Sequence, residues 1–416
     1  MAIIQTILNL GAPVMMPIII CILGLVVGMP LIKSLRSGFT VGVGFIGINL
    51  VTGLMGQYMS PLISALNEKW SFSVDTADLG WPVTSGIAFS NGSFVVAMFA
   101  VLIIINLVML MSKLTDTLNV DIWNFWHFIM GGSLVYALTG NFIAGCIAGG
   151  LYGGIVLLFA DNHDKRIQEF LGYPGVTITT QSFPVTLYIC MGIDWLIDHI
   201  PGVKEIKFSL TSLNPKIAFL GEPIFLGFIL GTILTAIGGF TWQECITAGV
   251  SLAAVMFILP RMVKILMEGL APISNAAQEF MSKHFPGRKV NIGMDFAILI
   301  GDPEVITLAM IMIPITLILS VTLPGNRLLP FTDLPALTYF MVAPVMAARR
   351  NSFRSIVIGI VQVIIMLYIA TDLAPLFTSI AHASKLVDAS QTSVSALIAG
   401  GEIIAWVMTK IISIFA

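Results

Sequence analysis

Residues 94–111 read FVVAMFAVLIIINLVMLM, an apolar run without a single charged side chain. A second run, VITLAMIMIPITLILSVTL at 305–323, likewise lacks charged residues. Segments of about 20 apolar residues match the ~30 Å hydrocarbon core of a bilayer, because a helix rises about 1.5 Å per residue. Lipid offers no hydrogen-bond partner to the backbone, so these runs are predicted to be transmembrane helices.

The whole chain shares this apolar composition. Its 416 residues are 57% hydrophobic and 10% charged, with a mean hydropathy of +0.97. Soluble domains carry about 25% charged residues, so the chain is predicted to be an integral membrane protein in contact with the lipid bilayer. The long continuous runs argue against a transmembrane barrel, whose strands alternate apolar and polar residues. The net charge of −2 gives no reason to expect nucleic-acid binding.

The sequence shows no motif for a metal, a cofactor or nucleotide hydrolysis. Four cysteines stand singly in apolar segments, without metal-ligand spacing, and are expected to be small buried side chains. A GxxxxGK[ST] loop is absent, so nucleotide hydrolysis is not expected to drive this chain. We therefore predict neither a metal site nor a cofactor.

An internal repeat organises the chain. LGAPVMMP, starting at Leu10, matches LGEPIFLG, starting at Leu220, and SPLISALNE at 60–68 matches APISNAAQE at 271–279. The offset of about 211 residues also superposes Trp195 on Trp406. These matches predict one integral membrane domain, 1–416, built from repeat one at 9–201 and repeat two at 219–412.

Basic residues alternate between the repeats. The connection PLIKSLRSG of repeat one is basic, whereas its counterpart GFTWQEC is not, and the next connection reverses this bias. Because Lys and Arg mark the cytoplasmic side, the repeats are predicted to be inverted, with an odd number of crossings each. Five crossings fit each repeat: roughly 10–32, 38–62, 86–112, 124–140 and 142–160, then again about 211 residues later.

Two further segments, 174–200 and 385–411, begin with a polar tract and then turn apolar. We interpret each as a re-entrant hairpin with its polar tip at membrane depth, the alternative being a plain pair of short helices. The predicted fold is thus an all-α polytopic membrane protein with two inverted repeats of about five transmembrane helices, each followed by a re-entrant hairpin-like segment. Inverted repeats with interrupted helices are typical of transporters.

Polar side chains within membrane segments are costly, so they indicate candidate sites. IAFSNGSF (87–94) and its counterpart ILIGDPEV (298–305) each place a polar break at the start of an apolar run. Free N–H groups at such a helix start, beside polar side chains, would bind substrate hydroxyls. The alternative is ordinary turn chemistry at the interface. The candidates here are Asn91 and Ser93, with their counterparts Asp302 and Glu304.

Two other polar clusters are candidates. NVDIWNFWH (119–127) places Asp121, Asn124 and His127 on one helical face between tryptophans, although aromatic interface anchoring explains part of this pattern. The hairpin tips supply amides and hydroxyls at Thr179–Ser182 and Gln391–Ser393, including Thr180, Gln181 and Thr392. These groups fit a neutral, hydroxyl-rich ligand better than an ion. No run of buried arginines indicates an anionic substrate.

FLGEPIFLGFILG (219–231) holds one carboxylate, Glu222, where repeat one has Ala12. A glutamate at a helix start complements the helix dipole. Inversion puts this position on the predicted cytoplasmic side in repeat two only, so a role facing a phosphoryl donor is the second interpretation.

Four stretches in order, NVDIWNFWH, FLGEPI, PRMVKILMEGLAPI and PGNRLLPFTDL, resemble the galactitol-type enzyme IIC, the membrane permease component of the bacterial phosphoenolpyruvate-dependent phosphotransferase system, in the ascorbate/galactitol superfamily. The resemblance covers nearly the whole chain. It implies a homodimer in the bacterial plasma membrane whose moving core carries a sugar alcohol across. It also implies phosphorylation from a phosphocysteine on a separate enzyme IIB, itself supplied by enzyme IIA, so that the chain is not an enzyme by itself.

Carried over by position, the resemblance implies a sugar pocket at Ser90–Asn91, His127 to Gly131, Thr180–Gln181 and Asp302. Asp302, His127 or Glu222, or the neighbouring Glu304, would activate the attacking hydroxyl as a base. The alternative function is a cation-coupled secondary transporter of a small polar solute, which inverted repeats and membrane carboxylates suit equally well.

Overall fold

The structure, a computed structural model of the chain, describes a protein that is mostly helical. It covers residues 17–18, 20–22, 24–25, 28–70, 76–88, 91–119, 121, 124–206, 208, 223–284, 290–330, 333–384 and 393–414. Among these described residues, four helices are long and apolar enough to cross a membrane: Ser93–Met111, Phe142–Leu171, Pro303–Thr322 and Ser352–Ala383. With the shorter apolar helices, these confirm the prediction of an all-α polytopic membrane protein.

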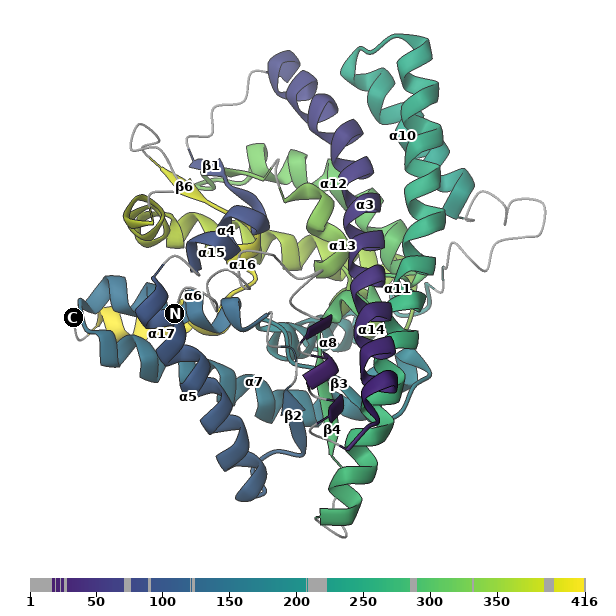
Figure 1. Cartoon of the computed structure of the whole chain (residues 1–416). Helices are drawn as coiled ribbons and strands as arrows, with labels where there is room; N and C mark the ends of the chain where they lie inside the picture. Colours follow the sequence, from purple (N-terminus) through teal and green to yellow (C-terminus); the bar gives the residue numbers. More distant parts are fainter. Residues whose placement is uncertain are drawn as a thin grey trace.

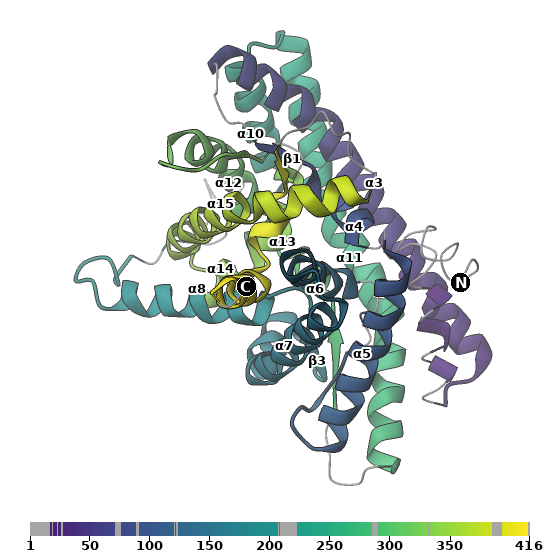
Figure 2. The ribbon, with the colours of Figure 1, turned by 90° about the vertical axis from the view of Figure 1, so that its left-hand side faces the viewer.

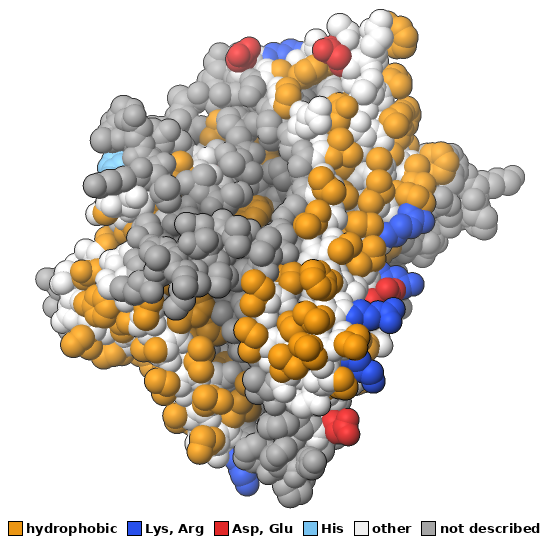
Figure 3. Space-filling model, in the orientation of Figure 1, with side chains coloured by type: hydrophobic (Ala, Val, Ile, Leu, Met, Phe, Trp, Pro, Cys, Tyr) orange, Lys and Arg blue, Asp and Glu red, His pale blue; other side chains and the backbone are white. Residues whose placement is uncertain are grey.

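Three helices lie together along one side of the molecule (Figure 1). They are α3 (Leu31–Trp70), α10 (Pro223–Gly238) and α11 (Trp242–His284), and α11 packs against both others. Two of them exceed the crossings predicted at 38–62 and 249–273, because helix continues into the polar flanks. Figure 3 shows apolar side chains over the outer face of this group, with Lys and Arg along its edge. Exposed residues such as Phe39 and Leu50 give this face the character of a lipid-facing surface.

The other described helices form a second group, and several of them cross α3 and α11 at a steep angle (Figure 2). From the N-terminal half come α4 (Gly80–Ala88), α5 (Gly92–Met111), α6 (Phe125–Thr139), α7 (Phe142–Leu171) and α8 (Phe183–Asp198). From the C-terminal half come α12 (Pro303–Thr322), α13 (Leu337–Phe340), α14 (Val342–Ala347), α15 (Ser352–Ala383), α16 (Leu397–Gly400) and α17 (Ile403–Ser413), with 3-10 helices η3 (Phe296–Leu299) and η4 (Leu334–Ala336).

Each of the four membrane-length helices begins at an Asn or Asp that caps it. The side-chain oxygens of Asn91, Asn141, Asp302 and Asn351 accept hydrogen bonds from the first free backbone N–H groups of α5, α7, α12 and α15. Such caps satisfy donors that lipid cannot satisfy. The polar breaks at Asn91 and Asp302 are therefore helix starts, as predicted.

The crossing predicted at 335–351 is broken into short helices. Pro344 lacks the N–H that would bond to the carbonyl oxygen of Phe340, the residue where α13 ends. The side-chain amide of Gln362 on α15 donates to that oxygen instead, at 3.0 Å. A buried amide thus replaces the backbone bond that the proline removes.

Two small parallel sheets join the halves of the chain. In one, β1 (Thr76–Asp78) lies between β5 (Leu328–Leu329) and β6 (Val394–Ser395). In the other, β4 (Asn291–Met294) lies between β2 (Thr117–Asn119) and β3 (Val176–Ile178). Each central strand therefore pairs with two strands from the other half of the chain.

The segments predicted as re-entrant hairpins take a different form. Segment 174–200 is strand β3, a tight turn at Thr179–Ser182, and helix α8, which is neither a helical hairpin nor a pair of short helices. The later segment has β6 followed by α16 and α17, with residues 385–392 outside the described part. Pairing with β4 and β1 gives these polar tracts the hydrogen bonds that they would otherwise lack.

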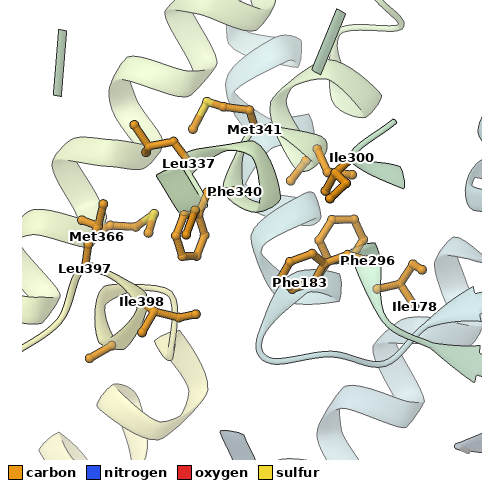
Figure 4. Packing of buried hydrophobic residues seen from close by; sticks show 14 of the residues in the cluster. Ile178, Phe183, Phe296, Ile300, Leu337, Phe340, Met341, Met366, Leu397 and Ile398 are labelled. Atoms are coloured by element: carbon orange, nitrogen blue, oxygen red, sulfur yellow. The ribbon is translucent and has the colours of Figure 1, made fainter. Parts of the chain in front are cut away.

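The core lies where these turns meet. Figure 4 shows Phe183 and Phe296 on one side and Phe340, Met366 and Ile398 on the other. All of these side chains are buried. Residues from both halves of the chain thus enclose one apolar centre, which holds the polar turns in place.

Candidate functional site

A buried hydrogen-bond network centres on Glu402, which ends the α16 turn and begins α17. One carboxylate oxygen lies 2.5 Å from Nδ1 of His127, and the other accepts from the hydroxyl of Tyr152. Tyr152 also contacts the Ser182 hydroxyl at 2.8 Å. The side chains of His127, Tyr152 and Glu402 are 2%, 0% and 1% exposed, so the network has no access to bulk water.

Gln181 connects this network to the turn after β3. Its side-chain amide donates to the carbonyl oxygen of Ile398 at 2.8 Å and to Glu402 at 3.4 Å. Its backbone has a φ of +53°, a left-handed conformation that is unusual for a residue other than glycine. Backbone strain of this kind concentrates at functional sites. The turn is therefore built to present Gln181 to the Glu402 network.

A second polar cluster lies beside the first, through Thr180. The Thr180 hydroxyl donates to Asp121 at 2.9 Å, and the Asn124 amide bridges Asp121 and Asp295, at 2.9 and 2.6 Å. Burial, reinforced by the charge of Asp295, raises the pKa of Asp121 to about 8. Burial raises the pKa of Asp295 as well. The pair therefore holds a proton at neutral pH.

A small cavity of about 20 Å³ adjoins the network. Gln181, Thr186, Gln362 and Tyr339 contribute to its lining together with apolar residues, among them Phe183 and Phe340. The aromatic walls are visible in Figure 4. A water molecule needs roughly 10–15 Å³ of such space, so this conformation admits water but not a sugar alcohol. A substrate would enter only if the surrounding elements moved apart.

Gly131 lies where α6 meets the network. A Cβ atom at this position would be 2.7 Å from Cδ1 of Tyr152 and 3.1 Å from Cβ of Ala405. Both are shorter than ordinary carbon–carbon contacts of about 3.5–4.0 Å. The glycine predicted at the site therefore acts by making room for Tyr152, whose hydroxyl contacts Glu402.

Asn91 lies at a different cavity, an open one of about 640 Å³. Ser93, Gly140 and Tyr136 also line it, together with residues from the end of α15. Asn91 is exposed and caps α5, while Ser93 donates to its oxygen at 3.0 Å.

Asp302 and Glu304 begin α12, where they contact the start of α15. The Asp302 carboxylate accepts from Arg350 at 2.8 Å, and buried Glu304 accepts from the Ser352 hydroxyl at 2.7 Å. These residues lie in a polar group of their own rather than among the contacts of Glu402.

The structure thus brings together His127, Gly131, Thr180 and Gln181 of the predicted site. Ser90, Glu222 and Thr392 lie outside the described residues. Tyr152, Asp295 and Glu402 were missed by sequence reasoning. Glu402 carried the same signal as Glu222, a single carboxylate in an apolar run, in LIAGGEIIAWVM. Within the described ranges, no group of three or more His, Cys, Asp or Glu side chains is arranged to hold a metal ion.

Comparison with known proteins defines the class of this permease-like fold. A family model described as "PTS system sugar-specific permease component" matches residues 6–390. A protein of Escherichia coli (strain K12), "Putative permease IIC component", is 32% identical over 410 residues, covering 98% of this chain and 93% of that protein. The "PTS system galactitol-specific EIIC component" of the same strain is 33% identical over 407 residues, covering 98% of this chain and 90% of that protein.

The chain therefore belongs to the family of sugar-specific permease components of the phosphotransferase system. The resemblance seen in the four sequence motifs is confirmed, as is the prediction of a multi-pass membrane protein with a role in sugar transport.

Proposed function

We propose that the protein takes up a galactitol-like sugar alcohol across the bacterial plasma membrane and that phospho-enzyme IIB, recharged by enzyme IIA, phosphorylates it in the same process. Two supports are family membership and the relatives named galactitol-specific. The observation that carries the proposal is the buried network of His127, Gln181, Tyr152 and Glu402. Amide, hydroxyl and imidazole groups suit a neutral ligand rich in hydroxyl groups.

In this proposal His127 is the base. When its Nδ1 proton is donated to Glu402, its other ring nitrogen is free to accept a proton. A substrate hydroxyl attacks the phosphorus of the donor's phosphocysteine, the sulfur–phosphorus bond breaks, and the thiolate leaves as the hydroxyl proton passes to His127. Glu402 stabilises the resulting imidazolium. Asp302 and Glu222 are the competing candidates, and phosphorylation rates of the single variants decide among the three.

The remaining predicted site residues keep binding roles in the proposal. Thr180 and Gln181 lie next to the small cavity and would bind substrate hydroxyls once it opens. Ser90, Asn91, Glu304 and Thr392 would contact the substrate at other points of its path. Asn91 lines the open cavity and is the most accessible of these to a solute.

We propose two inverted repeats as the architecture behind transport, with repeat one at 9–201 and repeat two at 219–412. The exchange of strands supports this, because each central strand comes from one half and both its neighbours from the other. Val176 pairs with Ile292 as Val394 pairs with Ala77. In this register the two valines are equivalent although they lie 218 positions apart (394 − 176), whereas the sequence repeat has an offset of about 211.

We further propose that transport is an elevator movement in a homodimer. Helices α3, α10 and α11 would be the static dimerisation part. The two sheets and the other helices would be the moving core (Figures 1 and 2). The cavity of about 20 Å³ supports a moving core, since it is too small for a sugar alcohol in this conformation.

Vesicle uptake tests the function against the cation-coupled alternative. Vesicles containing the protein, with an ion gradient but without enzyme IIB, should not accumulate unmodified galactitol. Adding phosphorylated enzyme IIB to the cytoplasmic side should start uptake. Vigorous accumulation driven by the gradient alone would instead establish a secondary transporter.

A further inference from the structure

Four arginines form one cluster around the turn between α14 and α15: three are close in sequence, at 349, 350 and 354, and the fourth is Arg166. Arg350 donates to Asp302 and to the carbonyl oxygen of Phe170, and its guanidinium stacks over the Phe170 ring at 4.0 Å. Arg354 pairs with Asp194 and Asp198, at 2.9 and 2.5 Å. The sequence shows no run of buried arginines, because Arg166 joins the other three only through the fold.

The other two arginines, Arg166 and Arg349, complete the cluster. Arg349 directly precedes Arg350, and Arg166 lies one helical turn before Phe170, whose carbonyl oxygen accepts from Arg350. The charges of Arg349, Asp194 and Glu169 all act on Arg166. Nη1 of Arg166 is buried and has no hydrogen-bond partner. In the part of the chain that the structure describes, neither arginine forms an ion pair within 4.0 Å. A buried guanidinium donor without an acceptor is costly, and a bound anion would satisfy it.

The backbone of the turn holds two of the arginines in a strained conformation. Arg349 and Arg350 both have left-handed conformations, with φ of +51° and +62°. The turn between α6 and α7 has the same plan, with a left-handed residue directly before the Asn cap, and there the residue is Gly140, with φ of +66°. Left-handed backbone is strained for a residue that carries a side chain. Arginine is thus retained where glycine would fold more easily, which points to a role in binding.

The location indicates the kind of ligand. Clusters of Arg and Lys mark the cytoplasmic side of membrane proteins, and this cluster adjoins Asp302, a residue of the proposed site. Guanidinium groups bind phosphate through paired, charge-assisted hydrogen bonds. A lipid head group in a flat bilayer reaches a partly enclosed donor such as Arg166 Nη1 less readily than a phosphoryl group on a projecting side chain.

We propose that Arg166 and Arg349, with Arg350 at the edge, form the docking surface for the phosphorylated donor chain and contact its phosphoryl group. This inference rests on the proposed function. Arg350 holds Asp302 in place, while Arg166 and Arg349 supply donors to the incoming phosphate oxygens. The cluster would then favour the phosphorylated donor over the unphosphorylated one, so that the spent donor is released.

The test measures galactitol phosphorylation by proteoliposomes as the concentration of phosphorylated enzyme IIB is varied. The variants are Arg166→Gln and Arg349→Asn, the second chosen because asparagine tolerates left-handed backbone. Arg261→Gln is the matched control, since Arg261 lies on α11 and stacks over Phe257. Loss of a charge-assisted hydrogen bond should raise the KM for the phosphorylated donor about tenfold or more. The Kd for galactitol should not change.

Three outcomes would overturn the inference: an unchanged KM in both cluster variants, an equal rise in Arg261→Gln, or a rise that follows the content of anionic lipid. Suppose that galactitol phosphate competes with the phosphorylated donor in the wild-type protein but not in the variants. The cluster would then bind the product rather than the donor, which would also overturn the inference. Failure of the wild-type protein to depend on the donor would be a different result, because it would reject the proposed function itself.

Discussion

Replacing Glu402 should separate the structural role of its carboxylate from its charge. The carboxylate accepts from His127, Tyr152 and Gln181. In Glu402→Ala, Tyr152 keeps its contact with the Ser182 hydroxyl and Gln181 keeps its bond to the Ile398 carbonyl oxygen. Only Nδ1 of His127 loses its one acceptor.

The expected loss of stability in Glu402→Ala follows from these hydrogen bonds. A buried donor left without a partner costs about 1–3 kcal/mol, and each of the two weakened donors loses about 0.5–1.5 kcal/mol. Glu402→Ala should therefore lower the free energy of unfolding by about 2–6 kcal/mol. Glu402→Gln retains an oxygen for His127 and an amide that donates to the Tyr152 hydroxyl, so it should cost about 0.5–1.5 kcal/mol.

Unfolding in mixed detergent micelles measures both variants, with Glu205→Ala as a control that removes an exposed carboxylate. Galactitol binding, measured by calorimetry, should weaken strongly in Glu402→Ala and persist in Glu402→Gln. Phosphorylation should fall in both, because the imidazolium of His127 loses its counter-charge. Equal and small losses of stability in Glu402→Ala and Glu205→Ala would refute the reasoning.

Two further predictions concern the packing and the protonation of the site. Gly131→Ala should displace the Tyr152 ring and cost about 1–3 kcal/mol of stability. The control is Gly192→Ala, where an added Cβ meets nothing within 4 Å and should cost nothing comparable. Thermal unfolding compares the two variants, and equal midpoints would reject the steric argument. Burial raises the pKa of Asp121 to about 8, so between pH 4 and pH 8 the folded state keeps a proton that the unfolded chain releases. The free energy of unfolding should therefore fall as the pH rises from about 4 to about 8, by at most about 1.4 kcal/mol per pH unit. Thermal unfolding of Asp121→Asn should show a smaller decline between pH 6 and pH 8, and an unchanged slope would assign that proton elsewhere.

The helices that cross the membrane were predictable because their signal is local. The run at 94–111 and the polar break at Asn91 define α5 by themselves, and predicted crossings 124–140 and 142–160 begin within a residue of α6 and α7. Apolar length and Asn or Asp caps are properties of neighbouring residues.

The centre of the site was only partly predictable because its contacts are long-range. Polarity within a membrane segment identified His127 and Gln181 as candidates, but nothing local connects His127 with Glu402, 275 positions away. Tyr152 looked like one more apolar helix residue. The strand pairing that positions Gln181 depends on three short strands from two parts of the chain, each too short for a periodic pattern.

The arginine cluster has the same origin. Arg350 and Asp302 carry opposite charges on separate segments, and the sequence alone gives no reason to pair them. The strain at Arg350 becomes visible only beside Gly140, which precedes the Asn cap in the corresponding turn.

The most direct test of the account follows the chemical form of the substrate. Vesicles carrying the protein receive galactitol labelled with carbon-14 on the side opposite to phosphorylated enzyme IIB, and the label that crosses is separated by anion exchange. The account predicts that the transported label elutes as the phosphate ester, in proportion to the phosphocysteine consumed. Label that accumulates as free galactitol, with the phosphocysteine intact, would contradict the coupling of transport to phosphorylation.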